Sequence, residues 1–190
     1  MKRAAFLDRD GVINVEHGYV HTWEDFEFVP GSVDAMRRLH EAGYALVVIT
    51  NQSGLARGMY TEAQYQQLTA TLREHLLGQG VPLAAVYHCP HHPKGTVPAL
   101  AVDCDCRKPA PGMLLQAARA LDLSLADSVL VGDKGSDAEA GRAAGVGRVM
   151  LVRSGHALTP ADLALADSVH ADLAAATADL LADATAARAP

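Results

Sequence analysis

The sequence predicts an α/β fold in which a doubly wound parallel sheet carries helices on both faces. Short apolar runs with strand character alternate with helical segments along the chain, which is the pattern of parallel sheets with crossover helices. The run at 44–49 is continuously apolar, as in strands covered on both faces. With 190 residues the chain suits one well-cored domain. We therefore expect a single domain over 1–190, with a core to about 155 and a helical tail at about 160–190.

Local signals place the individual elements. A buried strand ends at Asp8, Ser32 is a plausible N-cap, and Thr61 begins a Thr-x-x-Gln capping box. We expect the face of that helix with Tyr65, Leu68, Leu72 and Leu76 to be core. In chain order we predict strands at 3–7, 44–49, 84–88, 128–131 and 148–152, helices at 33–43, 61–80, 111–121, 136–144 and 171–182, loops at 9–31 and 89–106, and a frayed end.

Composition excludes several function classes. Hydrophobic residues make up 49% and charged residues 20% of the chain, so it is expected to fold. The net charge of -6 argues against nucleic acid as the main partner. No window is apolar enough for a membrane span, and the start is too short for a signal peptide. Three cysteines cannot all pair, which favours a reducing compartment. We expect a cytoplasmic protein that acts as a monomer.

Polar residues directly follow three of the predicted strands. They are Asp8, the pair Thr50-Asn51, and Asp133. Parallel α/β sheets bind ligands beyond the carboxyl ends of their strands, near the point where strand order reverses. These residues should therefore converge on one crevice.

The segment Asp8-Arg9-Asp10-Gly11 places two carboxylates two residues apart after a strand. In extended geometry both leave the same side of the chain, and Gly11 permits a sharp turn. Alone, this motif fits a strand-ending turn equally well. Further along, however, the chain supplies a hydroxyl at Thr50, cations at Arg107-Lys108 and an acid at Asp133, each at a strand end or helix start.

This ordered set resembles the haloacid dehalogenase superfamily of phosphohydrolases, over nearly the whole chain to about residue 155. The resemblance implies a Rossmann-like core without a separate cap domain. It implies that Asp8 is the nucleophile and forms an aspartyl-phosphate, and that Asp10 acts as general acid and then as base. Thr50 and Lys108 would hold the transferring phosphoryl group. Mg²⁺ would be bound by the Asp8 side chain, the Asp10 carbonyl and the Asp133 side chain.

Electrostatics explains why such a site needs cations. A phosphate dianion beside Asp8 and Asp133 is repelled by about 4 kcal/mol per charge pair, for ~4 Å and an effective dielectric near 20. A divalent ion and Lys108 reverse that sign. Asp10 must be protonated when the leaving group departs, although a free aspartate titrates near pH ~3.9. We expect the neighbouring carboxylate and the phosphate to raise the pKa of Asp10.

The loop at 89–106 contains a possible zinc site. Cys89, His91, Cys104 and Cys106 form a Cys₃His set, which suits a closed, tetrahedral and therefore structural Zn²⁺ site. Such a site would hold the loop that delivers Arg107 and Lys108. The alternative interpretation is a few buried thiols, and His88 and His92 compete for the imidazole position. Pro90 and the family resemblance favour His91.

Within the superfamily, a zinc loop here is similar to that of two groups of small phosphatases. One removes the 7-phosphate of a heptose 1,7-bisphosphate in the synthesis of heptose nucleotides for lipopolysaccharide, and the other acts on histidinol phosphate. Segments 8–14, 17–20 and 50–58 resemble the first group. A non-catalytic phosphate-binding module is a third hypothesis, against which the second acid, Asp10, speaks. The residues expected to touch substrate are Glu16, His17, Gly18, Tyr19, Thr50, Asn51, Gln52, Ser53, Arg107, Lys108 and Lys134.

Several other polar and aromatic residues have ordinary structural interpretations. We expect Asp137 to cap the helix after the Asp133 loop rather than bind metal, and His156 to have no role in the site. The aromatic residues Trp23, Phe26 and Phe28 should pack the first loop onto the body of the domain.

Overall fold

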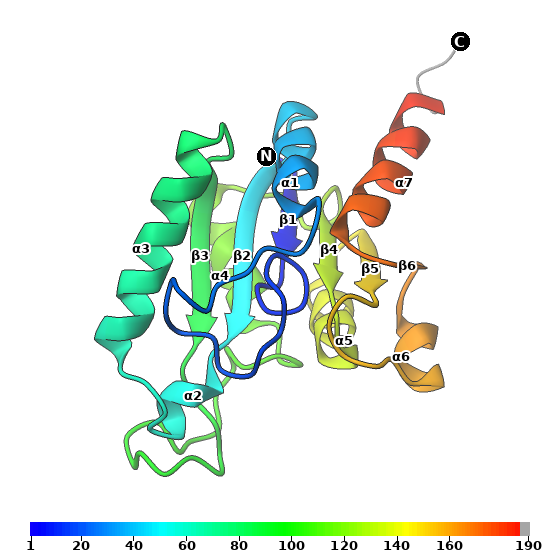
Figure 1. Cartoon of the computed structure of the whole chain (residues 1–190). Helices are drawn as coiled ribbons and strands as arrows, with labels where there is room; N and C mark the ends of the chain where they lie inside the picture. The colour runs from blue at the N-terminus through cyan, green and yellow to red at the C-terminus, as the bar shows by residue number, and fades with distance from the viewer. Residues whose placement is uncertain (187–190) are drawn as a thin grey trace.

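The computed structural model describes residues 1–186 and contains one sheet with helices on both sides (Figure 1). The strands are β1 (Ala4–Leu7), β2 (Ala45–Asn51), β3 (Leu83–Cys89), β4 (Val129–Gly132), β5 (Arg148–Val152) and β6 (Ser168–His170). The helices are α1 (Ser32–Glu41), α2 (Ser53–Ala56), α3 (Glu62–Gly78), α4 (Gly112–Leu121), α5 (Gly135–Ala144), α6 (Pro160–Leu165) and α7 (Leu173–Ala186).

The sheet has the order β3-β2-β1-β4-β5-β6, and every neighbouring pair is parallel. The predicted α/β fold with a doubly wound parallel sheet is thus confirmed. The chain builds outward from β1 through β2 to β3, and then returns to the other side of β1 for β4. Strand order therefore reverses between β1 and β4, and both strands run toward the lower edge of the sheet in Figure 1.

Successive residues of each strand face opposite layers. In β1, Ala5 and Leu7 lie in the hydrophobic cluster that includes α1, α3 and α7, whereas Ala4 and Phe6 lie in the cluster that includes α4 and α5. All four residues are fully buried. Burial on both faces explains why this strand is apolar at every position and does not alternate.

Local signals predicted one helix start correctly and another wrongly. The capping box at Thr61 is present, because its hydroxyl accepts the Gln64 N–H and its own N–H is bonded by the Gln64 side chain. The expectation that Ser32 caps α1 is wrong. Gly31, at φ 79°, precedes the helix without a side-chain cap, and the Ser32 hydroxyl donates to the Ile13 carbonyl at 2.9 Å. Ser32 therefore fastens the first loop to α1.

The structure contains more elements than were predicted, most of them in the C-terminal segment. The sequence did not indicate α2, α6 or β6, which are short, and α7 begins and ends later than the predicted helix at 171–182. Its residues Leu173, Ala176 and Leu180 are buried in the same cluster as α1. The tail thus covers the sheet and shields that end of the core. The predicted frayed end falls partly on 187–190, which lie outside the described residues.

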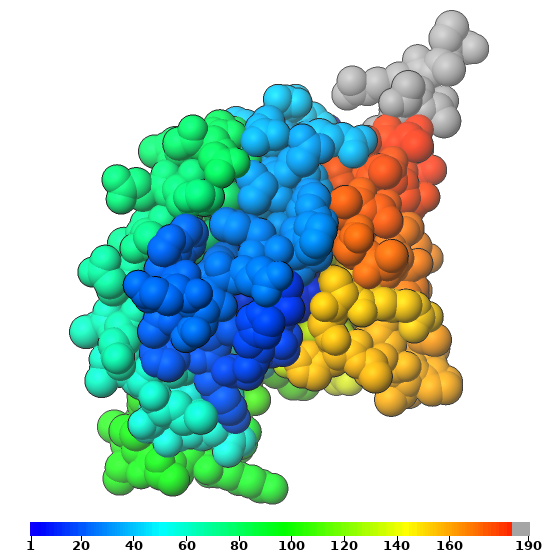
Figure 2. All heavy atoms as spheres, in the orientation of Figure 1, coloured from blue at the N-terminus to red at the C-terminus, as the bar shows by residue number. Residues whose placement is uncertain are grey.

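Two long loops lie at the carboxyl ends of the strands. Figure 2 shows residues 8–31 spread over the front of the molecule, and Trp23 and Phe28 pack against the core beside buried Phe26, as predicted. The loop after β3 packs on α2, where the Ala56 carbonyl accepts the N–H groups of Thr96 and Val97. None of the helices formed by residues 1–186 is long and apolar enough to cross a membrane.

Candidate active site

The centre of the site is an ion pair between Asp8 and Lys108. Asp8 directly follows β1, and its Oδ1 lies 3.0 Å from Lys108 Nζ. The same ammonium lies 2.6 Å from Asp137 Oδ1 and donates to the Ile49 carbonyl at 2.9 Å. Lys108 is 4% exposed, so its charge is almost completely withdrawn from water. A buried cation with two carboxylate partners is the local positive charge that an anionic substrate needs.

Asp133, which follows β4, lies on the other side of the reversal point. Ligand oxygens of Asp8, Asp133 and Asp137 all lie within 4.8 Å of one another. Asp133 is fully buried, and its Oδ1 has no hydrogen-bond partner. A buried carboxylate oxygen without a donor is costly unless a cation completes it. The oxygens of Asp8 and Asp133 therefore fit a divalent cation that prefers oxygen ligands, with Asp137 close by.

Glycine is required on two sides of Asp133. A Cβ at Gly11, which has φ 87°, would lie 2.3 Å from Asp133 Oδ2, and a Cβ at Gly155 would lie 2.0 Å from the same oxygen. The backbone can approach this carboxylate only without side chains at both positions. The Gly11 of the Asp-x-Asp-Gly segment thus serves both the turn and the cavity around Asp133.

The acidity of Asp8 is strongly perturbed. The pKa of Asp8 is raised to about 8, because burial and the carboxylates of Asp137, Asp133 and Asp10 together outweigh the lowering effect of Lys108. Without a metal this carboxyl therefore holds its proton to a higher pH than a free aspartate does. A cation placed among these carboxylates would favour the ionised, nucleophilic form.

The expectation for Asp10 is wrong for the substrate-free site. Burial alone would raise the pKa of Asp10, but the Arg9 guanidinium and hydrogen bonds from Asn14 and Gln52 lower it overall. Oδ1 accepts from Arg9 Nη2 at 2.9 Å and Asn14 Nδ2 at 3.0 Å. Oδ2 accepts from Arg9 Nε at 3.2 Å and Gln52 Nε2 at 3.1 Å. Asp10 is therefore ionised until a substrate changes its surroundings.

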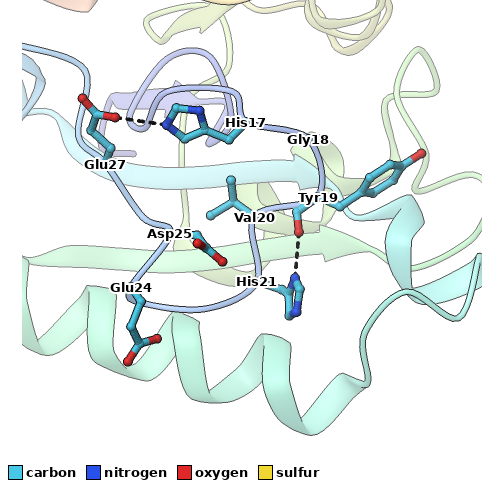
Figure 3. A pocket seen from close by; sticks show the side chains of 8 residues that line it. All are labelled: His17, Gly18, Tyr19, Val20, His21, Glu24, Asp25 and Glu27. Atoms are coloured by element: carbon cyan, nitrogen blue, oxygen red, sulfur yellow. Dashed lines mark hydrogen bonds and ion pairs between the residues drawn. The ribbon is translucent and has the colours of Figure 1, made fainter.

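Next to this centre is a cleft of about 310 Å³. It is bordered by a segment, residues 16–21, that we call the flap. Gly18 (φ 78°) and Tyr19 (φ 56°) form its turn, and the Glu16 carboxylate accepts the Gly18 N–H at 2.6 Å. Figure 3 shows Tyr19 projecting away from the loop, and this side chain is 40% exposed. The cleft is lined by Asp10, Glu16, Gly18, Tyr19, Asn51, Gln52, Ser53, Tyr60, Lys134 and His156.

Most of the residues predicted to bind phosphate or sugar come together. A small pocket at the base of the site joins Asp8, Asp10, Glu16, Thr50, Asn51, Lys108, Lys134, Ser136 and Asp137. Asn51 also holds the backbone of Lys108, because its side-chain amide donates to the Lys108 carbonyl and accepts the Lys108 N–H, each at 3.0 Å. Gln52 donates to Thr50 Oγ1 at 2.8 Å as well as to Asp10. Asn51 and Gln52 thus connect Lys108, Thr50 and Asp10 through hydrogen bonds.

Two predicted substrate contacts do not line the cleft. His17 lies on the far side of the flap and is 3.0 Å from Glu27 Oε2, as the dashed line in Figure 3 marks. Arg107 donates to the His91 carbonyl at 3.2 Å. Either residue would have to move before its side chain could reach a ligand in the cleft.

The four candidate zinc ligands are brought together. The sulfur atoms of Cys89, Cys104 and Cys106 are separated by 3.2, 3.4 and 3.6 Å, and His91 Nδ1 lies 3.4 Å from Cys106 Sγ. No disulfide joins the three thiols. A tetrahedral ion with Zn–S bonds of about 2.3 Å requires ligand separations of about 3.8 Å. The set is therefore compact enough for zinc with only a small expansion.

The two competing histidines have other partners. His88 lies 3.2 Å from Glu62 Oε1 and packs on Tyr65, with 4.2 Å between ring centroids. His92 Nδ1 accepts the Lys94 N–H at 3.0 Å. His91 is thus the imidazole that the structure places beside the thiols.

Sequence reasoning missed three residues of the site. His156 was expected to have no role, but its ring Nδ1 lies 2.6 Å from Asp133 Oδ2, and its backbone N–H donates to the same oxygen. Tyr60 donates its hydroxyl to Gln52 Oε1. Arg9 lies behind Asp10. Only Arg9 had a local signal, its place between the two aspartates. Asp137 caps α5 as predicted, by accepting the N–H groups of Asp133 and Lys134, and also contacts Lys108.

Comparisons with known proteins agree with this geometry. A family model described as HAD-hydrolase-like matches residues 105–184. The D-glycero-beta-D-manno-heptose-1,7-bisphosphate 7-phosphatase of Escherichia coli K12 is 54% identical over 157 residues, which are 83% of this chain and 82% of that protein. The D-glycero-alpha-D-manno-heptose-1,7-bisphosphate 7-phosphatase of Photorhabdus laumondii is 49% identical over 154 residues, which are 81% and 84%.

A solved structure is similar over almost the whole chain. It is a D,D-heptose 1,7-bisphosphate phosphatase from B. bronchiseptica complexed with magnesium and phosphate, with a TM-score of 0.80 and 34% identity. The alignment covers 95% of this chain and 99% of that one. With its parallel sheet, its acids at the reversal point and these relatives, the chain belongs to the haloacid dehalogenase-like hydrolases, in the family of the heptose-1,7-bisphosphate 7-phosphatases.

Proposed function

We propose that this protein is a magnesium-dependent phosphatase that removes the 7-phosphate of D-glycero-D-manno-heptose 1,7-bisphosphate and leaves heptose 1-phosphate. The observation that carries the proposal is the pair of Asp8 and Lys108, 3.0 Å apart at the reversal point of the sheet, with Asp10 in the adjoining cleft. The names of the relatives supply the substrate. The product would feed heptose nucleotide synthesis for lipopolysaccharide.

In the proposed reaction, a carboxylate oxygen of Asp8 attacks the phosphorus of the 7-phosphate. The bond between phosphorus and the C7 oxygen breaks, and Asp10 donates a proton to the departing alkoxide. The resulting aspartyl-phosphate is hydrolysed by a water from which Asp10 withdraws a proton. Thr50 and Lys108 hold the phosphoryl oxygens. Because Asp10 is ionised in the substrate-free site, it must gain its proton when the phosphate dianion arrives, and the added negative charge favours that uptake.

The acids of the site fit Mg²⁺. Asp8, the Asp10 carbonyl and Asp133 would hold it, with Asp133 Oδ1 as the buried oxygen in need of a partner. When bound, the ion supplies positive charge that offsets the repulsion between phosphate and carboxylates. The chain's own part is to fix the carboxylates, which it does through Lys108, the Gly11 and Gly155 backbone and the Asp137 cap.

For the loop at 89–106 we propose a structural Zn²⁺ bound by Cys89, His91, Cys104 and Cys106. Burial, together with a hydrogen bond to Cys106, raises the pKa of the Cys89 thiol, so its sulfur needs a nearby cation to ionise at neutral pH. The ordered loop would place Arg107 near the remote phosphate of the substrate, where its guanidinium could bind in a fork. This requires release of the Arg107 contact with His91.

Further parts of the proposal concern the protein as a whole. We propose that residues 1–190 act as one phosphatase domain, as a monomer in the cytoplasm, with the flap and the zinc loop as the only cover of the cleft. The expected substrate contacts are those predicted from the sequence, from Glu16 to Tyr19, Thr50 to Ser53, Arg107, Lys108 and Lys134. Relatives are named for both anomers of the bisphosphate, so either anomer is a candidate substrate.

Phosphate release from purified protein tests the proposal. The substrates are the α and β anomers of heptose 1,7-bisphosphate, fructose 1,6-bisphosphate and histidinol phosphate, each with and without Mg²⁺, and Asp8→Asn is the negative control. We expect the highest kcat/KM for one heptose anomer, only with Mg²⁺. A higher kcat/KM for histidinol phosphate would contradict the substrate assignment. Absence of hydrolysis of every phosphate would instead leave a binding module.

A further inference from the structure

Arg9 is a buried cation for which the proposed reaction has no use. Its side chain is 2% exposed, although it lies between the two acids of the reaction. Withdrawing a guanidinium from water costs several kcal/mol unless its partners are well placed. The contacts that offset this cost therefore indicate what Arg9 does.

The contacts of Arg9 join Asp10 to the flap. Nε and Nη2 bind the two oxygens of Asp10 in a fork, at 3.2 and 2.9 Å. Nη2 also donates to the Val20 carbonyl at 2.6 Å. The guanidinium carbon lies over the ring of buried Tyr65, 6.0 Å from its centroid. Arg9 is thus held by packing and binds both parts at once.

A second connection runs between the same two places. His21, the next residue of the flap, stacks on Tyr60 with ring centroids 4.9 Å apart and an angle of 9° between the rings. The Tyr60 hydroxyl donates to Gln52, and Gln52 donates to Asp10 Oδ2 at 3.1 Å. Figure 3 shows Val20 and His21 together on the flap beside Tyr19. Both residues are therefore tied to the carboxylate of Asp10.

From this geometry we infer that Arg9 is a positioning residue, which fixes the orientation of the Asp10 carboxylate relative to the flap and so to the leaving group. The inference rests on the proposed phosphatase function. A lysine at this position would keep the charge, but one ammonium group lacks the planar fork that binds both oxygens of Asp10 and the Val20 carbonyl together. Arg9→Lys therefore disturbs the orientation of the Asp10 carboxylate while it keeps the positive charge beside it.

In the first step of the reaction, misorientation of the acid matters only when the leaving group needs a proton. Benzyl phosphate releases a strongly basic alkoxide, whereas 4-nitrophenyl phosphate releases a weakly basic phenolate that departs unprotonated. The two compounds are of similar size and lack the sugar that the flap would recognise. For each, kcat/KM reports steps up to departure of the leaving group, and later hydrolysis of the aspartyl-phosphate does not enter. The ratio of the two constants also cancels the fraction of folded enzyme.

The experiment measures this ratio, benzyl over 4-nitrophenyl, with Mg²⁺ for the wild type, Arg9→Lys and Arg9→Gln. General acids typically contribute about 10²- to 10⁴-fold, so we expect the ratio to fall at least about tenfold in Arg9→Lys. In an Asp10→Asn background the same change should leave the ratio unaltered, because Arg9 acts through Asp10. Arg37→Lys, which alters a partly exposed guanidinium paired with Asp34, is the matched control.

A ratio within about twofold of the wild type in Arg9→Lys and Arg9→Gln would overturn the inference. An equal fall of both constants would do the same, since it would show a general structural role. Neither result affects the proposed function, which is tested separately by the substrates that the wild type hydrolyses.

Discussion

Replacing Lys108 by methionine tests the electrostatic basis of the site. Methionine is of similar length and apolar, so the change removes the charge and little volume. Lys108 Nζ lies 3.0 Å from Asp8 and 2.6 Å from Asp137, within a buried pocket. When both carboxylates are ionised, each contact is a gross attraction of about 5–6 kcal/mol at an effective dielectric near 20, much of which offsets the desolvation of the three charges. Breaking a buried pair from one side typically costs about 3–5 kcal/mol.

The loss should depend on pH. Asp8 has a pKa of about 8 in the presence of Lys108, and without that cation its pKa rises further. Above pH 8 the folded variant therefore keeps a proton that the folded wild type has released. Because its folded state then binds more protons, the free energy of unfolding of the variant falls relative to the wild type as pH rises. We expect a smaller loss at pH 6 than at pH 9.

Urea unfolding in Mg²⁺-free buffer at pH 6 and pH 9 measures both effects, with Lys2→Met, an exposed lysine, as the control expected to stay within about 0.5 kcal/mol. Phosphate release should fall at least about a thousandfold in Lys108→Met, because a fixed cation is lost from the transition state. A loss of stability below about 1 kcal/mol at pH 9, equal to that at pH 6, would refute the assigned role of the ion pair.

Three further predictions follow from the same geometry. Asp8→Asn should lose turnover, and the metal-free variant should be more stable than the wild type at pH 9, because the amide removes one of the clustered carboxylates. Phosphate release measures the first effect and circular dichroism melting the second. A melting temperature below that of the wild type at pH 9 would contradict this prediction. Mg²⁺ should raise the melting temperature more at pH 8.5 than at pH 6, since protons compete with the ion for Asp8 below its pKa of about 8; an equal shift at both values would argue against Asp8 as a ligand. Cys106→Ser should abolish stoichiometric zinc in elemental analysis and give a melting temperature below that of the zinc-loaded wild type. The control Ser154→Ala, a change away from the thiols, should retain zinc. Full zinc content in Cys106→Ser would exclude the proposed ligand set.

The predictable parts of the fold are those that depend on neighbours in sequence. The capping box at Thr61 forms as the pattern indicates, because its two hydrogen bonds join residues three apart. The cap at Ser32 does not form, because its hydroxyl finds a distant partner, the Ile13 carbonyl, that local spacing does not reveal. The three-residue strand β6 was missed since it is defined by pairing with β5 rather than by its own pattern.

In the candidate site, too, the features that depend on strand ends were predictable, and those that depend on distant contacts were not. Asp8, Thr50 and Asp133 were predicted to converge because each ends a parallel strand, and the carboxyl ends of such strands meet at one edge. The contact of His156 with Asp133 joins residues 23 positions apart and has no signal in the sequence. In the substrate-free site the pKa of Asp10 is lowered, because Arg9, which the prediction omitted, outweighs the negative neighbours that it considered.

The sequence by itself determined the α/β class, the order of the chemical groups along the strand ends and the four residues of the candidate zinc set, since all of these follow from period, local spacing and residue type. Only the tertiary structure decided the protonation of Asp8 and Asp10, the link from Arg9 to the flap and the isolation of Asp133 Oδ1. These depend on burial and on which distant groups share a pocket. A charge in a pocket responds to every group within a few ångströms, whatever their separation along the chain.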